Sequence, residues 1–259
     1  MKCRILTATA LVASMSCAIA DEAPTDAPAD QLVIDATTER VMLDACAYLR
    51  SAERYSARYD VTFDDVLLDG TKVQYSRSNR VTMVRPDRLR LDINGDRGAR
   101  SFYYDGSSVT LYRPDSGLYA TTLAPDDLDA ALDLAEQKGI SLPLDDFLYT
   151  RPCVALGEHL RTGTYAGLHY LEGDWYHHLL LATDAVDVQL WVAQGDEPEF
   201  RKVVITYRDA PGAPQYAALI SDWDFTSEIE DAVFKFDPPE GVRQVAFLID
   251  GASQGGAEQ

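Results

Sequence analysis

Two adjoining hairpins and the helix after them, between Phe102 and Gly139, constrain the fold more than any other part of the sequence. In the first hairpin, the turn residues Asp105-Gly106-Ser107-Ser108 separate Phe102-Tyr103-Tyr104 from Val109-Thr110-Leu111-Tyr112. A second turn, Pro114-Asp115-Ser116-Gly117, leads into a strand at 118–122. Pairing of Tyr104 with Val109 would set Phe102 opposite Leu111 and make one side of the hairpin entirely apolar. That side needs a cover.

A helix predicted from Pro125 to Lys138 supplies the cover. Its apolar residues recur at helical spacing and form one stripe, made of Leu128, Ala131, Leu132 and Ala135. Pro125 suits the first turn of a helix, and Gly139 suits its end. The segment therefore predicts a sheet with a helix laid on one face.

Alternation of apolar and polar residues predicts strands in the rest of the chain. Between Tyr55 and Asp64 every second residue is apolar or aromatic, which is typical of a half-buried antiparallel strand. Further strands are predicted at 72–78, 80–84, 88–94, 164–172, 177–183, 186–193, 200–207 and 216–225, with a short one near 245–249. Helices are predicted at 31–52 and from Pro143 to Tyr149. The total is about ten or eleven strands in consecutive hairpins. Nothing alternates as strand, helix, strand, which argues against a doubly wound parallel sheet.

The N-terminus has the pattern of an export signal. Lys2 and Arg4 precede a short apolar run, and Ala18-Ile19-Ala20 forms a small-residue cleavage site before Asp21. Residues 1–20 are therefore predicted to be a cleavable signal peptide that leads to the periplasm. A lipoprotein anchored through Cys17 is the alternative, which Ser14-Met15-Ser16 before Cys17 matches poorly. Residues 21–30 are predicted to be a flexible linker, 31–250 a single domain and 251–259 a disordered tail.

The charge balance and the cysteines limit the partners and the compartment. The formal net charge of −19 argues against nucleic acid and anionic lipid surfaces as electrostatic partners. The sequence also shows no basic patch of the kind expected for recognising acidic partners. Once the signal is removed, Cys46 and Cys153 are left, and in an oxidising compartment they suggest one disulfide. Two buried free thiols are the alternative.

Three groups of residues have patterns found at sites of chemistry, but each is better explained by a structural role. His177 and His178, with Glu172 and Asp174 nearby, suggest a metal, but adjacent residues of a strand point to opposite faces, so hydrogen-bonded histidines are favoured. Asp126, Asp127 and Asp129 suit the positive end of a helix before they suit acid–base chemistry. Gly251-Ala252-Ser253-Gln254-Gly255 matches a nucleophile elbow but lacks the strand and helix that an elbow needs. We therefore predict no metal, no cofactor and no enzymatic activity.

The order of several motifs resembles a known superfamily. The motifs are Phe102-Tyr103-Tyr104-Asp105-Gly106, Tyr119 followed by Ala124-Pro125, His177-His178, Val188-Gln189-Leu190-Trp191, Arg201-Lys202-Val203-Val204-Ile205-Thr206-Tyr207 and Phe234-Lys235-Phe236-Asp237-Pro238-Pro239. From about residue 30 to 250 the chain resembles the LolA/LolB superfamily of periplasmic lipoprotein carriers. It resembles more closely a family of predicted periplasmic proteins of unknown function, domain-of-unknown-function 2092.

This resemblance implies an α+β, mainly β fold, in which a curved antiparallel half-barrel carries helices over its concave apolar face. Carriers of the superfamily hold acyl chains in the cavity beneath the helices, and no catalytic residues transfer from the family. The residues expected to line such a cavity are Tyr55, Tyr59, Phe63, Leu91, Phe102, Tyr104, Leu111, Leu132, Leu190 and Trp223. Burying each methylene group of a lipid contributes about 0.8 kcal/mol, so a slot for an acyl chain needs no catalytic group.

The predicted function is a periplasmic carrier or binding protein for a lipid or lipidated ligand, with a possible envelope protein partner. The alternative is a protein-binding or envelope-stress sensor module on the same fold, without transport.

Overall fold

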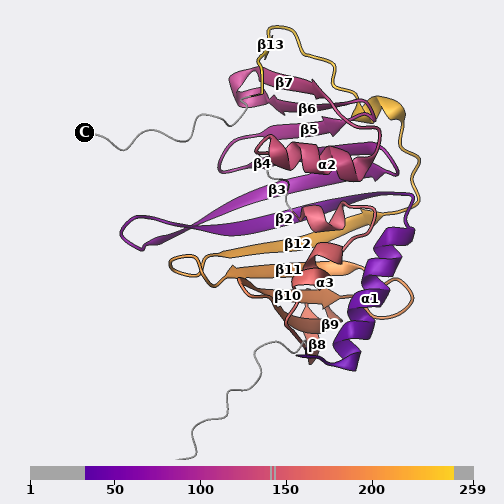
Figure 1. Ribbon diagram of the computed structural model, residues 1–259, viewed down its shortest axis with the longest axis vertical. Coiled ribbons are helices and arrows are strands. Elements are labelled where there is room, and N and C mark those ends of the chain that lie inside the picture. Colours follow the sequence, from indigo (N-terminus) through magenta and orange to yellow (C-terminus); the bar gives the residue numbers. More distant parts are fainter. Residues whose placement is uncertain (1–32, 141, 143, 248–259) are drawn as a thin grey trace, which may run out of the picture. The chain divides into compact units, whose positions relative to one another are not determined.

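One curved, unclosed sheet is the main element of a computed structural model that describes residues 33–140, 142 and 144–247 (Figure 1). Among these residues the sheet has thirteen strands, in the order β1-β8-β9-β10-β11-β12-β2-β3-β4-β5-β6-β7-β13. Their bounds are β1 Val33–Ile34, β2 Arg54–Val66, β3 Lys72–Val84, β4 Arg88–Gly95, β5 Arg100–Tyr104, β6 Ser108–Arg113, β7 Leu118–Leu123, β8 Thr162–Leu171, β9 Asp174–Ala182, β10 Val186–Val192, β11 Phe200–Tyr207, β12 Gln215–Asp224 and β13 Arg243–Gln244. The mainly β half-barrel is thus confirmed.

The register of the first predicted hairpin is confirmed. Tyr104 pairs with Val109 and Phe102 pairs with Leu111. The strands predicted at 72–78 and 80–84 are instead one strand, β3, because all thirteen of its residues pair with β2. The sheet is also not wholly antiparallel, since β1 runs parallel to β8 and β13 runs parallel to β7 at its two edges.

Two helices begin later than the sequence predicts. Val33 and Ile34 pair with β8, so α1 occupies Ala36–Ser51, and the Asp35 carboxylate caps it by accepting from the backbone N–H groups of Thr37 and Thr38. The helix α2 occupies Leu128–Gln137, because Asp127 is its N-cap. Pro125 lies before the helix, where its carbonyl accepts a hydrogen bond from the Tyr104 hydroxyl at 2.6 Å.

The segment after α2 contains less helix than predicted and one helix that was not predicted. Of the helix expected from Pro143 to Tyr149, only the 3-10 turn η2 at Asp145–Phe147 forms. A short helix, α3, follows at Val154–His159. Two further 3-10 turns, η1 at Pro114–Ser116 and η3 at Asp231–Phe234, complete the helical elements of the described residues. In these residues, no helix is both long and apolar enough to cross a membrane.

The core lies between the helices and one face of the sheet, which we call the inner face (Figure 1). The predicted apolar stripe of α2 is buried there, with Leu128, Ala131, Leu132 and Ala135 each at most 3% exposed. A disulfide joins Cys46 of α1 to Cys153, the residue before α3. The covering helices are therefore tied to each other by a covalent bond as well as by apolar packing.

The C-terminal segment covers part of the opposite, outer face. Phe234 is 1% exposed, and the ring of Phe236 lies 5.0–5.4 Å from the rings of Tyr103, Tyr112 and Tyr119 on β5, β6 and β7. The motif at 234–239 thus fastens this segment to the sheet.

Candidate functional site

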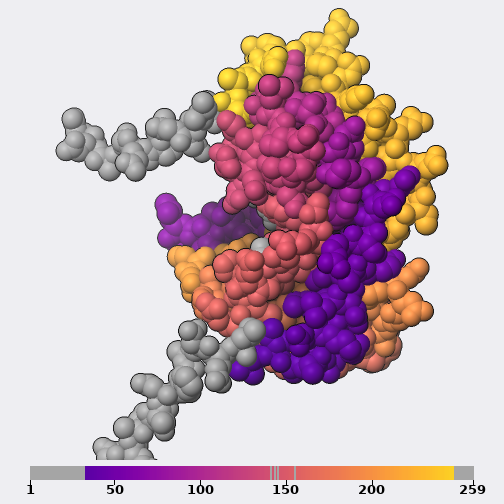
Figure 2. All heavy atoms as spheres, turned by 45° about the vertical axis from the view of Figure 1, so that its right-hand side comes forward, coloured from indigo at the N-terminus to yellow at the C-terminus, as the bar shows by residue number. Residues whose placement is uncertain are grey.

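The inner face of the sheet is larger than its helical cover. Ten strand spacings separate β8 from β7, about 48 Å at 4.8 Å each. Helix α1 is about 24 Å long, α2 about 15 Å and α3 about 9 Å, and each is about 10 Å wide. Figure 2 shows a hollow between the magenta segment that includes α2 and the orange strands, with the violet end of the β2–β3 hairpin behind it. The uncovered inner face at this hairpin end is the candidate site.

The structure places the ten predicted cavity residues in or against one apolar core. Seven are at most 3% exposed, namely Tyr55, Tyr59, Leu91, Phe102, Tyr104, Leu132 and Leu190. The other three, Phe63, Leu111 and Trp223, are partly exposed and pack against this core. Trp223 lies at the opposite end of β2 from Phe63, where its indole N–H donates to the Phe200 carbonyl at 3.1 Å. Whether the ten residues line a ligand cavity stays a prediction.

Aromatic rings and arginines occupy the inner face at the hairpin end. Phe63 of β2 pairs with Tyr75 of β3 and with Tyr216 of β12. The Arg77 guanidinium lies over the Phe63 ring at 5.2 Å and over the Tyr216 ring at 5.7 Å. Arg97, in the turn after β4, lies over the Tyr75 ring at 4.3 Å and forms an ion pair with Asp65. The apolar inner face thus ends in a rim that combines aromatic and cationic groups.

Three of the arginines share this end of the inner face without an acidic partner. Arg77 lies on β3, Arg100 on β5 and Arg113 on β6. No hydrogen bond or ion pair links them to an acidic side chain of the described residues. Burial lowers the pKa of Arg100, and the charges of Arg77 and Arg113 lower it further. Pairing of the strands therefore brings together three arginines that lie apart in the sequence.

Gly95 makes the approach of these arginines feasible. It pairs with Arg77, and a Cβ atom at Gly95 would lie 2.4 Å from the Arg77 Cβ. Such a contact is far shorter than carbon atoms tolerate. A side chain on β4 at this point would therefore displace Arg77, which lies between β2 and the strands that carry Arg100 and Arg113.

Buried polar atoms without a protein partner lie beside the arginines. The Tyr59 hydroxyl, both amide atoms of Asn79 and the Arg77 Nε are buried and have no hydrogen-bond partner among the described residues. Tyr59 and Asn79 pair across β2 and β3, and both are 0% exposed. Burial raises the pKa of Tyr59 well above its ordinary value, so its hydroxyl keeps its proton. Buried groups of this kind normally bind protein, water or a ligand.

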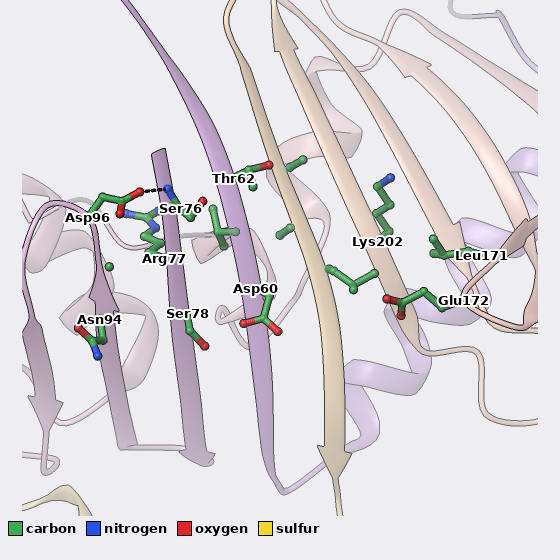
Figure 3. A pocket seen from close by; sticks show the side chains of 15 residues that line it. Asp60, Thr62, Ser76, Arg77, Ser78, Asn94, Asp96, Leu171, Glu172 and Lys202 are labelled. Atoms are coloured by element: carbon green, nitrogen blue, oxygen red, sulfur yellow. Dashed lines mark hydrogen bonds between the residues drawn. The ribbon is translucent and has the colours of Figure 1, made fainter. Parts of the chain in front are cut away.

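The outer face of the sheet has a shallow hollow of different character. Its volume is about 710 Å³, and Figure 3 shows the polar side chains that line it, including Asp60, Ser78, Asn94 and Lys202. Asp60 is occupied by an ion pair with Arg58, and Asp96 accepts from the backbone N–H of Ser76. The lining groups do not converge on a shared reacting position, so we do not assign a function to this hollow.

The two histidines point to opposite faces of β9, as the sequence predicts. His177 Nδ1 is 2.9 Å from the Tyr165 hydroxyl. His178 is 6% exposed, and its ring nitrogens lie 3.0 Å from His169 Nδ1 and 3.1 Å from Gln189 Oε1. In the described residues, no group of three or more His, Cys, Asp or Glu side chains is placed to hold a metal ion. The hydrogen-bonded interpretation of the histidines is confirmed.

The aspartates at the start of α2 have structural contacts. The Asp127 carboxylate accepts from the Ala130 N–H at 2.9 Å, and Asp129 accepts from the Thr150 N–H at 2.7 Å. The proposed elbow at 251–255 lies outside the described residues, as do the signal peptide, the linker, the tail and the last two residues of the strand expected near 245–249. The prediction is wrong over residues 245–247, because the short strand β13 forms earlier, at Arg243–Gln244.

Comparison with known proteins gives distant structural neighbours and one family. Solved structures similar to this chain include LprF from Mycobacterium bovis, which is 12% identical and has a TM-score of 0.45. The match covers 81% of this chain and 99% of the LprF chain. The lipoprotein LppX from Mycobacterium tuberculosis is 12% identical, with a TM-score of 0.43 and coverage of 76% and 100%. A LolA superfamily protein from Nitrosomonas europaea is 9% identical, with a TM-score of 0.39 and coverage of 77% and 97%.

No curated protein matches the chain. The curved, unclosed sheet with helices on one face is an open half-barrel. The model of a family described as predicted periplasmic protein (DUF2092) matches residues 38–248. The chain therefore belongs to the DUF2092 family of predicted periplasmic proteins.

Proposed function

We propose that this protein is a periplasmic carrier or binding protein that holds a lipid or lipidated ligand against the inner face of its sheet, beneath the helices. The observation that carries the proposal is the incomplete cover of an apolar inner face, seen as the hollow in Figure 2. Phe63, Leu111 and Ile205 are inner-face residues that stay partly exposed in the ligand-free chain. Apolar ligand sites are concave and apolar in this way, with few polar groups.

The free energy available from apolar burial sets how long a bound acyl chain must be. Burying ten methylene groups of an acyl chain contributes about 8 kcal/mol at about 0.8 kcal/mol each. Loss of translational and rotational freedom offsets at least about 4 kcal/mol of this. A remainder of about 4 kcal/mol corresponds to a Kd near 1 mM, so micromolar binding needs a longer chain or polar contacts to the headgroup.

We infer how a ligand would be accommodated from the seven buried residues of the predicted set. They fill the space under the helices in the ligand-free chain, so an acyl chain reaches them only if a helix moves away from the sheet. Helix α2 is the natural moving part, because two of its four buried residues are alanines, Ala131 and Ala135, with little apolar surface. Helix α1 is held at Cys46 by the disulfide to Cys153.

The test compares copurifying and added lipid. Protein from native periplasm is extracted with organic solvent for mass spectrometry, and uptake of a fluorescent fatty acid is measured. Leu111→Asp, on the inner face, should weaken uptake at least tenfold. Leu219→Asp, a partly exposed leucine on the outer face, is the matched control and should not. Absence of both lipid and uptake in the unaltered chain would refute the proposal.

A protein-binding or sensor role is the second candidate, favoured by the hairpin of β8 and β9. Leu168, Tyr170 and Trp175 are 42%, 63% and 52% exposed on it, and the last two rings are 5.7 Å apart. Among the described residues, the edge of β8 that faces β1 is paired only at Thr162 and Gly163. The rest of that edge is available for pairing with another chain. Crosslinking to an envelope protein that Trp175→Ala abolishes, together with no lipid uptake, would favour this role.

A further inference from the structure

We propose that Arg77, Arg100 and Arg113 bind the anionic headgroup of an amphiphile whose apolar tail lies on the inner face of the sheet. This inference rests on the proposed function and narrows the class of ligand. It concerns the hairpin end of the inner face, where the apolar surface meets the arginines.

The sheet register places the three arginines at one end of the same face. Arg77 alternates with the buried residues Asn79 and Val81 of β3 and so shares their face. Across the paired strands, Asn79 is opposite both Tyr59 and Ile93, and Ile93 is in turn opposite Arg100. Gly95 leaves the space above β4 free of a side chain at the position next to Arg77.

The chain provides no compensating charge for this group, although acidic residues are abundant. The sequence has 42 acidic and 23 basic residues, yet Arg77, Arg100 and Arg113 have no acidic partner among the described residues. Arginine stays protonated at every physiological pH, so the three charges persist. Their mutual repulsion is relieved when an anion binds between them. Carboxylate and phosphate oxygens fit because the guanidinium fork donates two parallel hydrogen bonds to such groups.

The buried polar atoms beside the arginines indicate how the ligand would be oriented on the inner face. The Tyr59 hydroxyl and the Asn79 amide lie one residue pair deeper than Arg77, toward the helices. Beyond them the next row is apolar, with Ala57, Val81 and Leu91 at 0% exposed. A molecule that meets these surfaces in order has an anionic head, a linking group that forms hydrogen bonds, and an apolar tail. Fatty acids and phosphate-bearing lipids share this chemistry.

The test uses the unaltered chain and probes of equal tail length below their micellar concentrations. Isothermal titration calorimetry compares dodecanoate and dodecyl phosphate with neutral glycerol monododecanoate and with cationic dodecyltrimethylammonium. The anionic probes should bind about tenfold more tightly than the neutral one, the size expected for hydrogen bonds to charged groups. The stronger of the two anionic probes identifies the carboxylate or the phosphate as the natural headgroup. Inorganic phosphate alone should bind at least tenfold more weakly than dodecyl phosphate.

The outcomes separate this inference from the proposed function. Equal affinity for anionic and neutral probes would overturn the inference and leave the proposed function intact. No binding of any probe would overturn both. Inorganic phosphate that binds as tightly as dodecyl phosphate would show a free-anion site and overturn the inference.

Variants locate the effect on the inner face. Arg100→Gln and Arg77→Gln should each weaken the anionic probes about tenfold and leave the neutral probe unchanged. Arg80→Gln, an exposed arginine on the outer face of the same strand as Arg77, is the matched control and should change neither. An equal loss in Arg80→Gln and Arg100→Gln would mean that general charge attraction is responsible, which would overturn the inference.

Discussion

Replacing Asn79 by valine should stabilise the ligand-free protein. Asn79 is 0% exposed in the middle of β3, and neither its amide oxygen nor its amide nitrogen has a hydrogen-bond partner. It pairs with Tyr59 on β2 and with Ile93 on β4. Most buried asparagines are bonded to protein, and their replacement destabilises. At this position a valine removes two unpaired polar groups and adds apolar contacts.

The magnitude follows from the burial. An amide held away from water without a partner costs about 1–3 kcal/mol in protein mutants. Valine is also favoured over asparagine in strands by up to about 1 kcal/mol, by an amount that depends on the position. Asn94→Val, at an exposed outer-face position of β4, measures that preference alone. We expect Asn79→Val to raise the free energy of unfolding by about 2 kcal/mol more than Asn94→Val, which is about 4–8 °C in Tm for a domain of this size.

Urea unfolding at pH 7, followed by far-ultraviolet circular dichroism, measures both variants against the unaltered chain. The same Asn79→Val variant should bind dodecanoate more weakly, because a polar group that contacts the ligand has been removed. Asn79→Val that unfolds at least 1 kcal/mol more easily than Asn94→Val would refute the reasoning. It would mean that the amide is fully satisfied without a ligand.

Three other predictions concern stability. Reduction of the Cys46–Cys153 disulfide, whose cysteines are 107 residues apart, should lower the free energy of unfolding by about 5 kcal/mol in the chain-entropy model. Urea unfolding with and without dithiothreitol measures the change. An equal effect of dithiothreitol on the double variant Cys46→Ala/Cys153→Ala would contradict the prediction. Phe234→Ala should cost about 3–5 kcal/mol, since the ring is 1% exposed, and a cost under 1 kcal/mol would show that the C-terminal segment does not hold the outer face. Burial lowers the pKa of His178 and the pKa of His177, so the folded chain favours their neutral forms. The resulting contribution to the free energy of unfolding is complete above about pH 6.5, the ordinary pKa of histidine. It is lost as the pH falls through the lower pKa values of the folded state. The fall in Tm from pH 8 to pH 5 should therefore be smaller in His178→Gln than in the unaltered chain. An equal fall would show that His178 does not contribute to the loss of stability at low pH.

Local patterns were sufficient to predict most of the strands, because each hairpin depends on residues close together in the chain. Alternation between Tyr55 and Asp64 and the turn at Asp105-Gly106 carry their own register. The start of α1 was missed for a long-range reason. Val33 and Ile34 pair with Thr162 and Gly163, far along the chain, and that pairing overrides a helical pattern.

The arginine group was missed because of one residue. Asn79 interrupts the apolar alternation of β3, so the sequence was divided into two strands at that point. The division hides that Arg77 shares a face with Val81 and Met83. In the structure Asn79 keeps the alternation and is buried, and its polarity marks the site rather than a break. The available signal was the unbroken spacing of residues 75, 77, 79, 81 and 83, with Gly95 opposite Arg77.

The unfavourable features of the inner face all lie at its hairpin end. Three arginines without acids, a buried amide without partners and a glycine that leaves room for Arg77 each reduce stability, while the rows nearer the helices are packed with apolar side chains. A sheet of this kind gains nothing in folding from such residues, because leucine or valine at the same positions would bury more apolar surface. A cluster of residues that reduce stability is expected at a binding site, where function constrains the choice of residue. The cost falls on the ligand-free chain alone, so a bound anionic amphiphile stabilises the protein at the end where its own side chains do not.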